Sequence, residues 1–75
     1  MPAARIDWRL FALFLEVKRI VRGLTYWQLS RQARVSPAIV RQAMTARPLD
    51  AIAFGKLCAW QGEVPEIFHA REGRP

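Results

Sequence analysis

Seven basic side chains with no acidic residue between them are the part of this sequence with the clearest chemistry. The chain of 75 residues has a formal net charge of +6, and residues 17–49 contain no Asp or Glu. A small domain this basic usually meets a polyanion, so the composition predicts a nucleic-acid partner, with a merely solvated surface as the alternative. The basic residues of this stretch are Lys18, Arg19, Arg22, Arg31, Arg34, Arg41 and Arg47.

Residues suited to catalysis or to metal binding are scarce. Cys58 is the only cysteine and follows Leu57, so we expect a small buried side chain in a reducing compartment. His69 is the only histidine, with no cysteine or second histidine nearby, so we expect it at the surface. The sequence therefore predicts no enzyme, no metal site, no cofactor and no small-molecule ligand.

The apolar run near the N-terminus does not have the pattern of a membrane span. Arg9, Glu16, Lys18 and Arg19 interrupt it, and no small-residue cleavage site follows it. We therefore expect neither a signal peptide nor a membrane partner, and we expect a cytoplasmic protein.

Two short helices must position the basic side chains. Thr25 and Gln28 have the spacing of a capping box, which predicts a helix that begins at Tyr26. Ser36 followed by Pro37 predicts a second helix over about residues 37–45. Only a turn fits between them, so residues 25–44 have the shape of a helix-turn-helix. Its apolar residues Leu29, Ala33, Val35, Val40 and Ala43 face one core, whereas Arg41, Gln42 and Thr45 face outward.

The first helix is expected over residues 8–22, where Asp7 caps it, Ile6 packs on Phe11 and Gly23 ends it. At 100° per residue its apolar side chains form two groups on nearly opposite sides. A small domain cannot readily bury both. The core group is Trp8, Phe11 and Leu15, and the larger group is Leu10, Leu13, Phe14, Val17, Ile20 and Val21.

The rest of the chain completes an all-α domain. Asp50 can cap a fourth helix that runs to Gly62, and Pro65 opens a short fifth helix with Ile67 and Phe68. We therefore expect a single five-helix domain over residues 1–75, with a core of about residues 6–70 and two loose ends.

The run LTYWQLSRQARVSPAIV, followed by RP, FGKLCAW and VPEIF, resembles the Cro and phage-repressor (Xre) family of helix-turn-helix transcription regulators over roughly residues 11–68. The resemblance implies a lambda-repressor-like fold with the helix-turn-helix at helices two and three. Three positions depart from the family pattern. Arg34 stands where a Gly is usual, so that either Arg34 adopts positive φ or the turn differs from the family's. Ser30 replaces a small Ala, and Met44 replaces a Glu, which leaves Arg19 needing another partner or a phosphate.

The resemblance also implies site residues. The second helix of the pair would enter the major groove, where Arg41 can bind guanine, Gln42 can bind adenine and the Ala38 methyl can touch thymine. The base-reading set is Ser36, Pro37, Ala38, Arg41, Gln42 and Thr45, and the backbone set is Thr25, Tyr26, Gln28 and Arg47. Plain capping is the alternative role for Thr25 and Gln28. Leu29, Val40, Phe54, Leu57 and Trp60 are expected in the core.

A homodimer would cover the larger apolar group of the first helix. We expect Leu10, Phe14, Val17, Val21, Val64, Ile67 and Phe68 at or beside the interface. The alternative is that the C-terminal segment folds over this group within one chain.

These observations predict a sequence-specific, nucleoid-associated transcription regulator that binds a roughly palindromic double-stranded DNA operator as a homodimer. The resemblance implies a repressor-like switch or controller protein of a phage or mobile element. Two alternatives stay open: a protein-binding module, such as an antiactivator or antitoxin, and a DNA-bending recombination factor.

Overall fold

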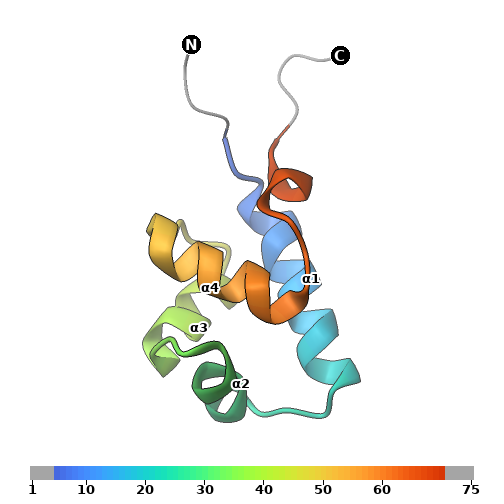
Figure 1. Cartoon of the computed structure of the whole chain (residues 1–75), viewed down its shortest axis with the longest axis vertical. Helices are drawn as coiled ribbons and strands as arrows, with labels where there is room; N and C mark the ends of the chain where they lie inside the picture. The colour runs from blue at the N-terminus through green and yellow to red at the C-terminus, as the bar shows by residue number, and fades with distance from the viewer. Residues whose placement is uncertain (1–4, 71–75) are drawn as a thin grey trace.

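The computed structural model describes residues 5–70 and is all-helical (Figure 1). The expected loose ends fall mainly on residues 1–4 and 71–75, which lie outside the described residues. None of the helices within residues 5–70 is long and apolar enough to cross a membrane. The elements in chain order are α1 (Trp8–Val21), α2 (Tyr26–Ala33), α3 (Pro37–Met44), α4 (Ala51–Gln61) and the 3₁₀ helix η1 (Pro65–Phe68).

The expectation of five α-helices is wrong for the last element, because η1 is a four-residue 3₁₀ helix. The chain becomes extended again at His69, where it forms an isolated antiparallel bridge with Ile6. Four residues between Val64 and this bridge leave room for one tight turn only. The described fold therefore has four α-helices and a 3₁₀ helix.

The predicted helix starts are confirmed. Thr25 and Gln28 form both hydrogen bonds of the capping box, at 3.1 and 2.9 Å. Asp7, Ser36 and Asp50 each accept a hydrogen bond from the backbone N–H three residues later. These bonds satisfy N–H groups that have no partner within the helix. The helix ends differ slightly from the expectation, since α1 and α3 each end one residue earlier than predicted.

The core lies where α1, α2, α3, α4 and η1 meet, and it confirms which face of α1 is internal. Phe11 and Leu15 are fully buried, together with Leu29, Val40, Leu57 and Phe68 from the other elements. Aromatic rings dominate the part nearest the chain ends, since Trp8, Phe11, Phe14, Phe54 and Phe68 form edge-to-face or tilted pairs with centroids 5.0–6.2 Å apart.

The single cysteine and the single histidine lie where the sequence predicted. Cys58 is buried, as predicted, and burial raises the pKa of its thiol to about 11. His69 is exposed, also as predicted. Neither side chain therefore contributes a reactive group to a cleft in the described structure.

A short backbone clamp joins the two ends of the described chain. The Asp7 N–H donates to the Phe68 carbonyl at 2.6 Å, and the Ala70 N–H donates to the Arg5 carbonyl at 2.8 Å. Figure 1 shows that the described chain begins and ends at the same end of the molecule, away from α2. The clamp holds Phe68 over α1 and leaves α2 and α3 free at the opposite end.

Candidate nucleic-acid interface

The turn between α2 and α3 takes the strained form, which was one of the two alternatives left open for Arg34. Arg34 has φ 64° and ψ 42°, a left-handed conformation that costs a non-glycine residue about 1–2 kcal/mol. The Lys56 side chain donates to the Arg34 carbonyl at 3.1 Å, and the Val35 N–H donates to the Ser30 carbonyl at 3.0 Å. These bonds hold the turn and thereby set the angle between α2 and α3.

Arg19 fixes the loop that leads into α2. Its guanidinium donates to both carboxylate oxygens of Glu16, at 2.9 and 2.7 Å, and to the Leu24 carbonyl at 2.7 Å. The guanidinium also lies over the Tyr26 ring, 4.8 Å from its centroid. The hydrogen bond from Arg19 holds the pKa of Glu16 below its usual value. Arg19 has thus found a partner, which its i,i+3 spacing from Glu16 could have revealed.

The outward side of α3 forms a shallow hollow of about 430 Å³, which we call the α3 hollow. It gathers four of the six predicted base-reading residues together with one predicted backbone residue. Its lining consists of Ala38, Arg41, Gln42, Thr45 and Arg47. Arg41 and Arg47 are exposed and have no acidic partner within residues 5–70. The hollow therefore presents two uncompensated guanidinium groups beside a methyl group.

Hydrogen bonds within the chain already occupy some polar groups of α3. The Gln42 side-chain amide donates to the Pro48 carbonyl at 2.6 Å. The Thr45 hydroxyl donates to carbonyls of the preceding turn, at 2.9 and 3.2 Å. Ser36 accepts from the Ile39 N–H, and Pro37 occupies the first helical position. Arg41 is therefore the residue of α3 best placed to donate two hydrogen bonds to a ligand.

The N-terminus of α2 is exposed, with Thr25, Tyr26 and Gln28 all at the surface. Both capping bonds are made, so capping is the observed role of Thr25 and Gln28. Trp27 is 60% exposed, an aromatic surface residue that the reading of the sequence left unassigned. The remaining first-turn N–H groups of α2 have no partner within the helix and so can meet an anion.

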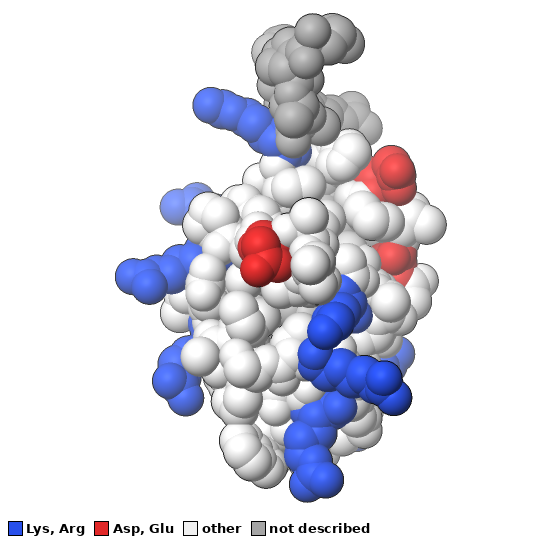
Figure 2. Space-filling view, turned by 60° about the vertical axis from the view of Figure 1, so that its left-hand side comes forward, with Lys and Arg blue, Asp and Glu red and all other residues white. Residues whose placement is uncertain are grey.

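Most of the seven basic residues carry charge that the described part of the chain does not neutralise. Two of them are paired, as Lys18 with Glu63 at 3.3 Å and Arg19 with Glu16. Figure 2 shows basic side chains in two places, in a row at the lower right of that view and separately along its left edge. The unpaired residues are Arg22, Arg31, Arg34, Arg41 and Arg47.

The residues predicted for a dimer interface fall into two groups. Val17, Val21, Val64 and Ile67 are exposed, whereas Leu10 and Phe14 are half-buried against the core. Phe68 is fully buried in its own chain, so it can lie beside such an interface but cannot itself contact a second chain. Its ring fills the space beside Phe11 and Phe14, with centroids 5.0 and 5.3 Å away.

Two further side chains extend the exposed apolar face of α1. Leu13 and Ile20 are 59% and 60% exposed. We call Leu13, Val17, Ile20 and Val21 the α1 stripe. A small hollow of about 250 Å³ at Leu13, Phe14, Val17 and Lys18 lies within it. The stripe is the largest apolar feature that α1 leaves uncovered.

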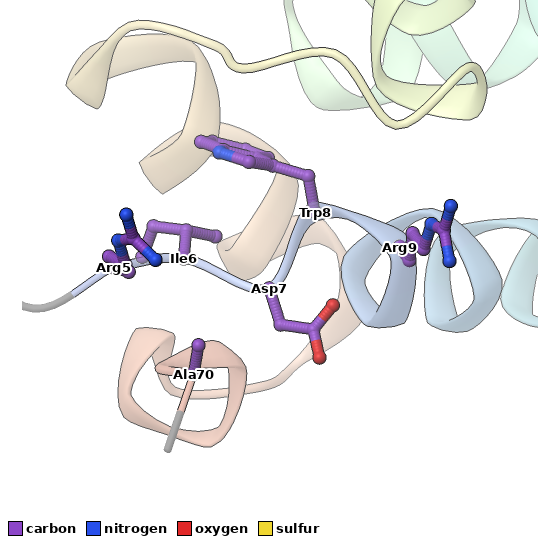
Figure 3. A pocket seen from close by; sticks show the side chains of 6 residues that line it. All are labelled: Arg5, Ile6, Asp7, Trp8, Arg9 and Ala70. Atoms are coloured by element: carbon purple, nitrogen blue, oxygen red, sulfur yellow. The ribbon is translucent and has the colours of Figure 1, made fainter. Parts of the chain in front are cut away.

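A larger hollow of about 540 Å³ at the start of α1 does not assemble reactive groups (Figure 3). Arg5 and Arg9 lie at opposite ends of it, and the Asp7 carboxylate caps α1 by accepting from Leu10. Within residues 5–70 no three His, Cys, Asp or Glu side chains gather as metal ligands would. The α3 hollow is therefore the better candidate for a functional site.

No protein-family model and no curated protein sequence matches this chain.

Proposed function

We propose that the protein is a sequence-specific DNA-binding regulator of transcription. In this proposal α2 and α3 form a helix-turn-helix of the lambda-repressor-like type, and α3 enters the major groove. One observation carries it: the exposed side of α3 gathers Arg41, Arg47 and Ala38 around a hollow, and α2 and α3 contain no acidic residue. A major groove admits an α-helix, and uncompensated guanidinium groups match the phosphate charge around it.

Arg41 supplies the main base contact in this proposal. Its exposed guanidinium can donate two parallel hydrogen bonds to guanine O6 and N7. Ala38 offers its methyl group to a thymine methyl. Gln42 contributes differently from the first expectation, because its amide nitrogen is held by Pro48. Its oxygen can accept a hydrogen bond from cytosine N4 or adenine N6, but a bidentate adenine contact first requires that this bond break.

The phosphate backbone would be held at two places. Arg47 lies just after α3, at the rim of the α3 hollow, and can neutralise one phosphate. The N-terminus of α2 offers its first-turn N–H groups, the favourable helix dipole and the exposed Tyr26 hydroxyl. These contacts would position α3 without reading sequence.

We further propose that two copies bind a roughly palindromic operator. The α1 stripe, with Val64 and Ile67, would form an isologous interface, because burying such side chains is worth about 1.5–3 kcal/mol each. The charges beside the stripe do not oppose association of two copies, because Lys18 and Glu63 form an ion pair that has no net charge. Two copies would present two α3 helices about 34 Å apart, one turn of DNA.

Sedimentation equilibrium at micromolar concentration tests the dimer. Val17→Glu should make the protein monomeric because it places a charge in the stripe. The matched control is Ile52→Glu, which changes a 73% exposed side chain of α4 and should leave the dimer intact. A wild-type protein that is monomeric throughout, or equal behaviour of the two variants, contradicts the interface.

Selection of binding sites from a random duplex library tests the DNA reading, followed by affinity measurements across a salt series. Arg41→Ala should cost about 1–3 kcal/mol on the selected site and lose preference at one base position. Arg47→Ala should weaken binding to all DNA sequences alike and reduce the slope of log affinity against log salt concentration by about 1. Arg9→Ala, the same substitution in the first turn of α1, is the control. Unchanged base preference in the Arg41 variant would remove its role as a reader.

A second candidate function rests on the α1 stripe. A protein-binding module of the antiactivator or antitoxin type would use Leu13, Val17, Ile20 and Val21 to hold another protein. Such a protein would show no preference among duplex DNA sequences, and Arg41→Ala would not change its activity. We prefer the DNA-binding proposal because it accounts for the acid-free α2 and α3. The resemblance to Cro-like regulators favours a switch or controller protein of a phage or mobile element.

A further inference from the structure

A second groove lies between α2 and α4, and we call it the α2–α4 groove. It has a volume of about 310 Å³ and shares no residue with the α3 hollow. Its lining consists of Gln32, Ala33, Arg34, Lys56, Ala59 and Trp60. We propose that the α2–α4 groove is a docking site for an acidic, partly apolar peptide segment of a partner protein.

The shape of the groove follows from its small residues. Ala33 and Ala59 contribute only methyl groups to the lining, and the longer side chains of Lys56 and Trp60 help to complete it. Ala33 is buried and Ala59 is exposed, so the floor is apolar and still open to solvent. Such a floor suits an aliphatic side chain of a docked segment.

Trp60 is held in place as one wall of the groove. The Arg22 guanidinium lies over its ring, 4.4 Å from the centroid, and the same guanidinium donates to the Trp60 carbonyl at 3.0 Å. The indole N–H donates to the Gln32 side chain at 3.0 Å. A half-buried aromatic ring fixed by two contacts, with its backbone carbonyl held by a third, is a preorganised surface, which reduces the entropy lost on binding.

The rim of the groove is basic and has no acidic neighbour on its own elements. Arg34 and Lys56 are exposed, and neither forms an ion pair with residues 5–70. Lys56 is positioned by its bond to the Arg34 carbonyl, and both residues line the groove. Neither α2 nor α4 contains an Asp or Glu. Charge complementarity therefore favours an occupant with carboxylates that flank an apolar side chain.

A peptide fits these observations better than a second segment of DNA. Phosphates bind exposed cations and helix N-termini, whereas this groove has methyl groups for a floor and lies at the C-terminal end of α2. The groove is separate from the α3 hollow, so the protein could hold DNA and an acidic segment at the same time. That arrangement would let a DNA-bound regulator recruit or block another protein.

The test uses the whole chain, labelled with ¹⁵N, and a short blocked peptide of Asp residues interrupted by Leu. A matched peptide with Asn in place of every Asp measures the contribution of charge. We expect the Asp peptide to shift the Trp60 indole signal, which is identified by its loss in Trp60→Phe. We expect the Asn peptide to bind about tenfold more weakly or worse, since several exposed charge pairs are lost and each is worth up to roughly fivefold.

Variants locate the site. Lys56→Gln should lower the affinity for the Asp peptide roughly threefold to fivefold. Ala59→Met, which changes no charge, should prevent binding of the peptide because the longer side chain fills the groove. Arg47→Gln, at the α3 hollow, is the control and should leave peptide affinity unchanged. The proposal is overturned if both peptides bind alike or if Arg47→Gln weakens the peptide as much as Lys56→Gln does. It is also overturned if duplex DNA displaces the peptide, because the groove would then be part of the DNA surface.

Discussion

The contacts of Arg19 predict how strongly the fold depends on the loop between α1 and α2. We expect Arg19→Ala to lower the free energy of unfolding by about 2 kcal/mol. The bond to the Leu24 carbonyl contributes about 1 kcal/mol, the partly exposed i,i+3 pair with Glu16 about 0.5 kcal/mol and the stacking on Tyr26 about 0.5 kcal/mol. For a domain of this size the sum corresponds to a fall in Tm of about 8–16 °C.

Urea unfolding followed by circular dichroism measures this loss. The control is Arg31→Ala, an exposed arginine of α2 with no ion pair in residues 5–70, which should change stability by less than about 0.5 kcal/mol. Arg19→Lys should recover only part of the loss, since an ammonium group cannot bridge Glu16 and Leu24 as a planar guanidinium does. Equal stability of the Arg19→Ala and Arg31→Ala variants would refute the reasoning.

The same contact has a pH dependence with a defined sign. The pKa of Glu16 is lowered from its ordinary value of 4.5 in the folded chain, because Arg19 donates hydrogen bonds to its carboxylate. Its contribution is therefore fully present above pH 4.5 and is lost as the pH falls through the folded-state value. We expect the stability difference between wild type and Glu16→Gln to shrink below pH 4.5. A difference that stays constant down to pH 2 would contradict the assignment.

Three further outcomes can be measured with the same unfolding assay or by alkylation. Ala46→Gly should stabilise the fold by about 1 kcal/mol because Ala46 has φ 61°, whereas the control Ala12→Gly, inside α1, should destabilise it by a similar amount. Gln61→Met should be stabilising by about 1–3 kcal/mol, since the buried Gln61 amide makes no hydrogen bond with the described chain, and a loss would contradict this. Iodoacetamide at pH 8 should modify Cys58 slowly in the native protein and rapidly in urea, because burial raises the thiol pKa to about 11. For the same reason the free energy of unfolding should fall as the pH rises from 9 toward 11.

Helix starts could be predicted from the sequence because neighbouring residues encode them. Thr25 and Gln28 bond to each other's backbone, and Ser36 caps the helix that begins at its neighbour. The left-handed conformation of Arg34 was one of two alternatives that the resemblance left open, and the structure decides between them. Such features depend on a few adjacent residues and little else.

Features that depend on distant residues could not be predicted in this way. The 3₁₀ form of η1 and the burial of Phe68 both follow from the pairing of His69 with Ile6, at the other end of the described chain. At the candidate site, the spacing within α3 indicated which side chains gather around Arg41. It did not indicate that Gln42 is held by Pro48, because that carbonyl is placed by the left-handed turn at Ala46.

Because of the clamp between residues 5–7 and 68–70, proteolytic cleavage near the C-terminal end of the described chain would disrupt the core. A protease that cleaves after Pro65 would remove Phe68, which is a fully buried ring although it lies near the end of the described chain. Phe11 and Phe14 would lose a stacking partner, and Asp7 would lose the carbonyl that holds the start of α1. Removal of these residues would therefore destabilise the whole domain, including α3 at the far end. In a cell, the lifetime of such a protein would depend on how often this clamp opens.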